Sequence, residues 1–335
     1  MKLSDFDYIL PEELVAQYPS AKRDDARLMV VDVRNGVIRH DIFSHLGDYL
    51  PPSSLVVVNN SKVIPARLLG CKERSQGQVE VFLLKHLGAR RYEAMLRPLK
   101  KIHEGERIKF SDDLSAVVVD RDARVVEFDQ DDVLGALEKV GHVPLPPYIK
   151  RKDDAGDRIY YQTVYAKYPG SVAAPTAGLH FTEGLMGSLK QAGHDFAQVT
   201  LHVNYGTFKP VEVEDIITHP MHYEHYAISA SVERELNEAK ACGRKIVAVG
   251  TTSCRTIESF ARSGKREDDT NIFIFPGVDF QITDVLVTNF HLPRSTLLML
   301  VSAFGGMDLI RHAYAQAVRE QYRFYSYGDA MIILR

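Results

Sequence analysis

The sequence predicts an α/β protein whose main domain, an irregular sheet or barrel rich in parallel strands, is interrupted by an inserted antiparallel β-barrel-like domain. Three observations support this prediction. The chain has 335 residues, too many for one simple core. Strand-like and helix-like segments alternate from about residue 159 onward, which favours a largely parallel sheet. Residues 62–141 instead alternate short apolar runs with turn residues, which is typical of a small antiparallel barrel.

These two sequence patterns divide the chain into two domains. We expect residues 1–60 and 150–335 to form the discontinuous α/β domain, and residues 61–149 to form the insertion. The chain leaves the insertion through residues 142–148, a proline-rich stretch that reads as a stiff extended connector.

Local signals place the elements of the first segment. Asn35-Gly36 between two apolar runs predicts a β-hairpin over residues 28–39. Pro11-Glu12-Glu13 is typical of a helix start. Residues 55–59 read as a buried strand, followed by a polar loop over residues 60–68.

The insertion and the final segment follow the same logic. Five short strands are expected in the insertion, at residues 78–84, 91–96, 107–110, 114–120 and 124–128. In the final segment, strands are expected at residues 197–203, 245–250 and 285–288, and helices at residues 183–191, 232–242, 252–262, 295–304 and 308–321. Thr182 and Ser231 are the expected N-caps of the first two of these helices.

Composition limits the classes of function. The net charge of −3 excludes a global basic field, so a nucleic acid would need a local basic patch. The insertion offers such a patch, formed by Arg90, Arg91, Arg97, Lys100, Lys101 and His103, although an ordinary solvated face is the alternative. Lys62 and Arg67 could hold an anion in the loop before it, with a solvated pair as the alternative.

Three widely spaced cysteines indicate neither disulfides nor a metal site, and no run approaches the ~20 apolar residues of a membrane span. We therefore expect a cytoplasmic protein with no membrane partner.

Residues 170–182 contain almost no long side chain. Gly170, Ala173, Ala174 and Gly178 leave the backbone open to close approach, so the stretch resembles the floor of a ligand site. The alternative is a crowded turn packed under a sheet.

Polar loops follow three of the expected strands, at residues 204–210, 251–255 and 289–295. In parallel folds, loops at the carboxyl ends of strands carry function. In the second loop, the N–H groups at a helix start suit a carboxylate or phosphate, and Arg255 can add a forked contact. A well-capped helix without a ligand is the alternative. Tyr205, Phe208, Tyr223 and Phe290 offer ring faces to a cation, or simply pack.

Residues 219–225 hold three histidines and a glutamate, which suggests a metal site. However, Pro220 disfavours the helical geometry that would align His219 and His222. Proton transfer by His222 and Glu224 fits better, because histidine changes its charge near neutral pH.

Taken together, these motifs resemble the S-adenosylmethionine:tRNA ribosyltransferase-isomerase family of queuosine biosynthesis. The similarity runs through the whole chain and is carried by residues 59–67, 173–181, 219–224, 248–255, 287–300 and 322–331. The chain departs from the family pattern at residues 204–206 and 268–270 and at Cys254.

The resemblance implies transfer and isomerisation of the ribosyl group of S-adenosylmethionine onto 7-aminomethyl-7-deazaguanine in tRNA, giving epoxyqueuosine and releasing methionine and adenine. S-adenosylmethionine is then consumed, and neither a cofactor nor a metal is expected. The resemblance also implies a monomer. A metal-dependent hydrolase and a non-catalytic RNA-binding module are the rival interpretations.

The implied chemistry assigns the candidate residues. Proton transfer falls to His222 and Glu224, with His180, His202 and His291 as alternatives, and His202 is also a candidate substrate contact. Thr176 and Asn289 would bind the ribose or adenine, and Thr251, Thr252, Ser253 and Arg255 the methionine carboxylate. Contacts with tRNA phosphates would come from Lys62, Arg67, Arg97, Lys100 and Lys101.

Overall fold

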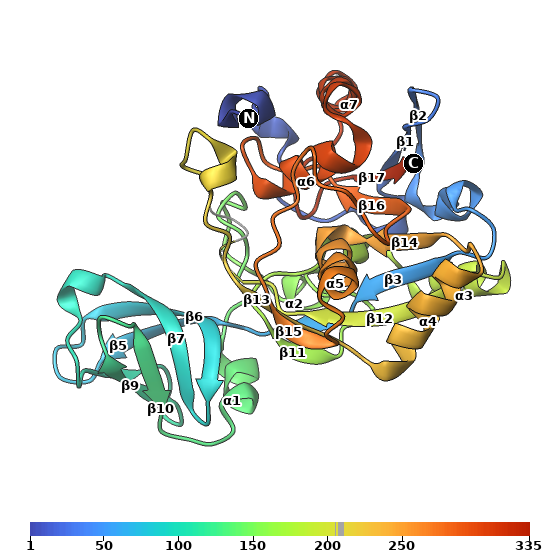
Figure 1. The fold of residues 1–335 in the computed structure, drawn as a ribbon. Helices are drawn as coiled ribbons and strands as arrows, with labels where there is room; N and C mark the ends of the chain where they lie inside the picture. Colours follow the sequence, from blue (N-terminus) through green and yellow to red (C-terminus); the bar gives the residue numbers. More distant parts are fainter. Residues whose placement is uncertain (205, 207–210) are drawn as a thin grey trace.

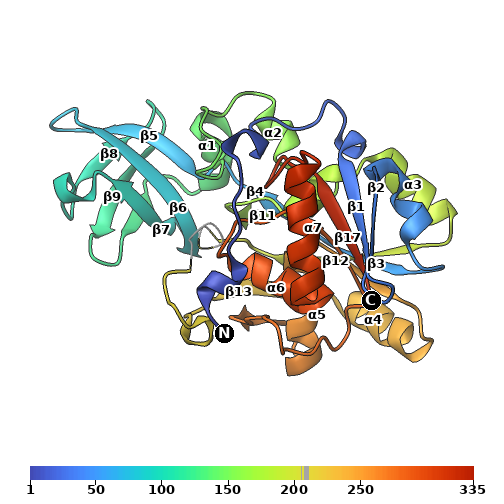
Figure 2. The same ribbon diagram turned by 90° about the horizontal axis from the view of Figure 1, so that it is seen from above.

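A computed structural model describes residues 1–204, 206 and 211–335. Its main domain is built on a nine-stranded sheet, and the barrel projects from one side of that domain (Figure 1, Figure 2). In spatial order the strands are β15 (Glu267–Thr270), β13 (Glu224–Ile228), β12 (Asp195–Leu201), β3 (Leu55–Asn59), β14 (Ile246–Val249), β16 (Val285–Asn289), β17 (Ala330–Leu334), β1 (Arg27–Asp32) and β2 (Val37–Ile42).

The four central strands, β12, β3, β14 and β16, are parallel, whereas both edges carry antiparallel pairs. The predicted irregular, parallel-rich sheet is therefore confirmed. Since parallel strands end at the same edge, the segments that follow Asn59, Leu201, Val249 and Asn289 meet at one end of the sheet.

Helices cover both faces of the sheet. They are α3 (Glu183–Gln191), α4 (Ala230–Ala241), α5 (Gly250–Ser263), α6 (Thr296–Gly305) and α7 (Met307–Arg319). Helix α1 (Val133–Val140) instead packs in the barrel core, and the short α2 (Asp157–Tyr160) lies beside a separate small apolar cluster. Alternate residues of β3 enter different cores: Val57 packs in the core with α4 to α7, and Val56 in the core with α3. This explains why β3 is apolar from Leu55 to Val58.

The insertion is a closed six-stranded barrel with its own apolar core. Around the barrel the strands are β10 (Val125–Phe128), β7 (Arg91–Arg97), β6 (Gln78–Gly88), β5 (Arg67–Lys72), β8 (Arg107–Lys109) and β9 (Ser115–Asp120). Strand β5 was missed. The expected loop over residues 60–68 instead contains β4 (Ser61–Val63) and the start of β5, because Leu68 pairs with Val81 and closes the barrel.

Two other local predictions were wrong. Residues Glu12–Leu14 form only one turn of 3₁₀ helix, and α4 is capped by Ser229, whose side chain accepts from the Val232 N–H, rather than by Ser231. The N-cap at Thr182 is confirmed, since its hydroxyl accepts from the Leu185 N–H. Strand β11 (Tyr168–Ser171) pairs with β4 in a small separate sheet.

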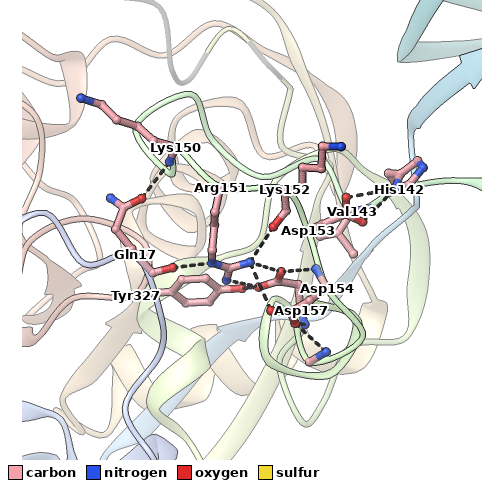
Figure 3. Close-up of polar contacts among 11 residues, drawn as sticks. Gln17, His142, Val143, Lys150, Arg151, Lys152, Asp153, Asp154, Asp157 and Tyr327 are labelled. Atoms are coloured by element: carbon pink, nitrogen blue, oxygen red, sulfur yellow. Dashed lines mark hydrogen bonds and ion pairs between the residues drawn. The ribbon is translucent and has the colours of Figure 1, made fainter.

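The connector from the barrel is fixed to the main domain by a buried ion pair (Figure 3). Arg151 donates two hydrogen bonds to Asp157, at 2.6 and 2.7 Å, and the Tyr327 hydroxyl donates a third at 2.6 Å. Burial opposes ionisation of Asp157, but the bonds from Arg151 and Tyr327 hold its pKa below the usual value. This attachment sets the course of the chain just after Tyr148.

No helix in the described residues combines the length and apolar character needed to cross a membrane.

Candidate functional site

A cavity lies at the carboxyl ends of β14 and β16, with about 590 Å³ of empty space including its open mouth. We call it the Asn289 pocket. Its polar wall comprises Thr176, Thr251, Thr252, Thr288, Asn289 and His291, and its aromatic wall Tyr148, Phe290 and Tyr325. Five predicted substrate or catalytic residues thus share one cavity, although they come from three distant segments of the chain.

The first turn of α5 opens on this pocket. Gly250 has a φ of 87°, a left-handed conformation that lets the helix begin directly after the buried strand β14. Among the residues that the structure describes, no side chain caps this helix start, so its N–H groups are available to an anion. The buried Thr252 hydroxyl also has no partner in the described part of the chain. The alternative interpretation, a helix start capped by a side chain, therefore does not apply to α5.

Asn289 is the last residue of β16 and is almost fully buried. Its amide donates to the Tyr325 carbonyl at 3.0 Å, which fixes the side chain. Its Oδ1 atom makes no hydrogen bond of normal geometry within residues 1–204, 206 and 211–335, although the Asn289 side chain interacts with the His180 imidazole and opposes the fall of its pKa. Because an unpaired buried acceptor is unfavourable, Asn289 is suited to accept from a bound hydroxyl or amine.

The floor of the pocket comes from the small-residue stretch. Ala173, Ala174, Thr176 and Ala177 line the cavity. Gly178 faces the other way, where a Cβ atom would lie 2.1 Å from the Tyr165 hydroxyl. The stretch is therefore both a pocket floor and a crowded turn.

The two buried candidate histidines lie in different places. His291 lines the Asn289 pocket with its Nε2 atom 2.7 Å from the Thr288 hydroxyl, and burial lowers its pKa to about 3. His180 lies in a separate cavity of about 270 Å³, beside Arg23, and burial lowers its pKa to about 4. Both imidazoles are therefore neutral and weakly basic near pH 7, which suits hydrogen bonding better than proton abstraction.

A second cavity, the Arg255 pocket, adjoins the first through Leu297, which lines both. It has about 610 Å³ of empty space, open mouth included. Its lining residues are Asn204, Gly206, His219, Met221, His222, Glu224, Arg255, Ile272, Phe273, Ile274, Thr296, Leu297 and Leu300.

A buried ion pair forms the polar centre of this second pocket. Arg255 and Glu224 are 6% and 4% exposed, and the Nη1 atom of Arg255 donates to Oε2 of Glu224. The other carboxylate oxygen accepts from the Asn204 N–H at 3.1 Å. The Nε and Nη2 groups of Arg255 are buried and find no acceptor among the described residues.

The histidine cluster is split by strand geometry. His222 and Glu224 line the Arg255 pocket. His225 lies on the opposite face of β13, 3.0 Å from Asp269 and 3.3 Å from Glu267. The three imidazoles of residues 219–225 therefore do not converge, and no trio of metal-type side chains is close enough to share an ion in the described portion of the chain.

Two candidates stand away from both pockets. His202 faces a groove beside Asn60 and Tyr168, whereas its neighbour Val203 lines the Asn289 pocket, because successive side chains of an extended segment point to opposite sides. The Ser253 hydroxyl donates to the Val249 carbonyl at 2.7 Å within α5 and lines neither pocket. Tyr205 and Phe208 lie outside the described residues.

The basic candidates divide into paired and unpaired groups. Lys62 lies 3.5 Å from Glu138, while Arg67 and Arg97 share Glu80 at 2.9 and 3.8 Å. Lys100 and Lys101 are exposed on the barrel and make no ion pair within the described residues. The paired residues match the ion-pair alternative, and the two lysines keep the charge free for a polyanion.

Sequence reasoning missed the two tyrosines of the Asn289 pocket. Tyr148 and Tyr325 pack with ring centroids 4.6 Å apart, and the Tyr148 hydroxyl bonds the Ser326 hydroxyl at 2.6 Å. The available signal was the position of Tyr148 at the end of a stiff proline-rich connector, where the chain direction is well defined.

Comparison with known proteins gives one consistent result. Residues 3–333 match the family model described as queuosine biosynthesis protein. The chain is similar to proteins named S-adenosylmethionine:tRNA ribosyltransferase-isomerase from a Sulfurihydrogenibium species (49% identity) and Symbiobacterium thermophilum (50%), with full coverage of both chains. A crystal structure of S-adenosylmethionine tRNA ribosyltransferase from Thermotoga maritima is 38% identical, covers 98% of this chain and 100% of its own, and has a TM-score of 0.57. The protein therefore belongs to the queuosine biosynthesis protein family.

Proposed function

We propose that this protein is a transferase-isomerase that moves the ribosyl group of S-adenosylmethionine onto the aminomethyl group of 7-aminomethyl-7-deazaguanine in tRNA. The product is epoxyqueuosine in the tRNA, and methionine and adenine are released. Relatives about 50% identical over the full chain carry this activity in their names. The proposal includes no resident cofactor, because S-adenosylmethionine is consumed as the sugar donor.

The observation that carries the proposal is the convergence of hydroxyl, amide and imidazole groups on the Asn289 pocket. They come from three segments, residues 173–177, 250–252 and 288–292, and they surround an uncapped helix start. A nucleoside bearing a carboxylate needs such a combination: donors and acceptors for sugar and base, and N–H groups for the anion.

We therefore propose that S-adenosylmethionine binds in this pocket. Thr176 and Asn289 bind the ribose or adenine, and the carboxylate lies at the start of α5 with Thr251 and Thr252. The sulfonium faces the rings of Tyr148 and Tyr325, since aromatic faces attract cations. Burial raises the pKa of Tyr325 to about 12, so this phenol stays neutral.

The reaction requires several proton movements. The sulfonium acidifies the adjacent ribose carbon, from which a base removes a proton. Adenine leaves with the electron pair of its glycosidic bond and takes up a proton, and methionine leaves with the electron pair of the carbon–sulfur bond. The incoming amine must lose a proton before its nitrogen forms the new bond to the ribosyl carbon.

His222 is the best placed base in the described residues. It lines the Arg255 pocket next to the Asn289 pocket and is exposed, unlike His180 and His291. Glu224 is bound to Arg255 and to the Asn204 N–H, so we assign it a role in positioning rather than as the first proton acceptor. Lys100 and Lys101, which make no ion pair within the described residues, contact tRNA phosphates. The working state is a cytoplasmic monomer.

The direct test is release of adenine from S-adenosylmethionine, with the protein treated with chelator. Adenine should appear only when tRNA carrying the aminomethyl base is present. Binding of tRNA without adenine release would favour an RNA-binding module. Activity that is lost with chelator and restored by metal would favour a metal-dependent enzyme.

A further inference from the structure

The Arg255 pocket carries polar groups that are typical of a binding site, and the position proposed for S-adenosylmethionine does not use them. Arg255 is more than nine-tenths buried, yet its Nε and Nη2 groups meet no acceptor in the described residues. Buried donors of this kind are unfavourable unless something completes them. A ligand with an acceptor atom, such as a carbonyl oxygen, would do so.

The charge of the pocket limits that ligand. Glu224 already neutralises Arg255, so the pair presents no net charge to a ligand. A neutral ligand that accepts from the guanidinium and donates to the carboxylate satisfies both partners. An added carboxylate would instead place two negative groups on one cation.

The walls of the pocket favour a flat ring. Met221, Phe273 and Leu300 line it together with Ile272, Ile274 and Leu297. Proteins bind unstacked bases between aromatic or apolar side chains and read their edges with polar groups. The Arg255 pocket has the same composition, because apolar side chains surround one polar pair, Arg255 and Glu224, that can both donate and accept.

The position of the pocket also fits a base that is part of an RNA. Glu224 begins β13, which lies next to the edge strand β15, and in both views β13 lies on the side of the sheet that faces the barrel (Figure 1, Figure 2). Lys100 and Lys101 keep free charge on that barrel. An RNA held by the barrel therefore approaches the Arg255 pocket from the barrel side.

We propose that the Arg255 pocket receives the acceptor base of the tRNA, turned out of its stack, and that Arg255 and Glu224 read its guanine-type edge. Arg255 donates to the O6 carbonyl, and Glu224 accepts from the N1–H and 2-amino groups. The inference rests on the proposed function. It assigns Arg255 to the acceptor base in place of the methionine carboxylate. It also places the aminomethyl group near Leu297, the residue that lines both pockets, and so next to the proposed position of S-adenosylmethionine.

The first experiment separates the two ligands of Arg255. Arg255→Met should leave the Kd for S-adenosylmethionine, measured by calorimetry without tRNA, within about twofold of wild type. It should lower kcat/KM for the modified tRNA at least tenfold, as expected for loss of a forked base contact. Thr252→Ala is the matched variant in the other pocket and should weaken S-adenosylmethionine binding. If Arg255→Met weakens S-adenosylmethionine binding tenfold and spares the tRNA, Arg255 holds the carboxylate and the inference is overturned.

The second experiment does not depend on removing a buried arginine. An RNA hairpin carrying the acceptor base is compared with one whose base lacks the 2-amino group. Wild type should prefer the complete base about tenfold in kcat/KM, and Glu224→Gln should lose most of that preference. Equal preference in both proteins would overturn the inference. If wild type releases no adenine with either RNA, it is the proposed function that fails.

Discussion

Tyr148 and Ser326 are separated by 178 positions, and their hydroxyl groups are joined by a hydrogen bond of 2.6 Å. This bond ties the connector from the barrel to the C-terminal segment, at the wall of the Asn289 pocket. The Arg151–Asp157–Tyr327 cluster makes a second tie only a few residues away (Figure 3). The chain that returns from the barrel is thus part of the wall of the Asn289 pocket.

Replacement of Tyr148 should separate the roles of its ring and its hydroxyl. Tyr148→Ala is expected to weaken S-adenosylmethionine binding about tenfold, since a ring facing a cation contributes roughly 1 to 2 kcal/mol. Tyr148→Phe keeps the ring and should stay within about threefold of wild type. Calorimetric Kd values provide the measurement. Equal losses in both variants would mean that the hydroxyl bond, rather than the ring, forms the site.

The buried histidines predict a loss of stability in mild acid. The pKa of His291 falls from 6.5 to about 3 on folding because the ring is buried, so the unfolded chain binds a proton more readily than the folded chain. The stability is present above pH 6.5 and is lost as the pH falls towards 3. Between pH 7 and 5 the loss is about 2 kcal/mol for this histidine.

Urea unfolding of wild type and His291→Asn at both pH values measures this contribution. The variant cannot take up the proton, so its free energy of unfolding should fall less between pH 7 and 5. Identical losses in the two proteins would contradict the buried neutral state. His180→Asn should behave in the same way, because burial lowers the pKa of His180 to about 4.

Gly178 predicts a specific steric conflict. Gly178→Ala should destabilise the protein by about 1 to 3 kcal/mol, because its Cβ atom would lie 2.1 Å from the Tyr165 hydroxyl. That hydroxyl is buried without a partner in the described residues, so Tyr165→Phe alone should change stability little. In the Tyr165→Phe background, Gly178→Ala should reduce the free energy of unfolding by measurably less. An unchanged cost in thermal or urea unfolding would show that the conflict lies elsewhere.

The barrel lysines predict a salt-dependent effect on RNA binding. Lys100→Glu with Lys101→Glu should weaken tRNA binding and reduce the slope of log K against log salt by about 2, one unit for each lost phosphate contact. Arg234→Glu on α4, an exposed residue of the main domain, is the control. Titrations at several salt concentrations give the slope. A slope equal to that of the control would remove this face of the barrel from the RNA interface.

Much of the fold could be predicted because it is encoded in short local patterns. Asn35-Gly36 marks a turn, Thr182 caps a helix, and the apolar run of residues 55–59 is a central strand. Strand β5 was missed because its exposed and buried residues alternate irregularly, and its pairing with β6 and β8 defines it. The expectation that the loops at the carboxyl ends of strands carry function followed from parallel strand order, which depends on topology rather than on side-chain contacts.

The sequence by itself determined the family, the two architectures and the set of polar residues near the chemistry. Only the tertiary structure decided which of these residues share a cavity. His202 and Val203 are neighbours in the chain but face opposite sides, whereas Glu224 and Arg255 are 31 positions apart and form one buried pair. The reason is that side-chain direction in extended backbone changes at every residue, so which cavity a side chain lines is set by strand register and packing.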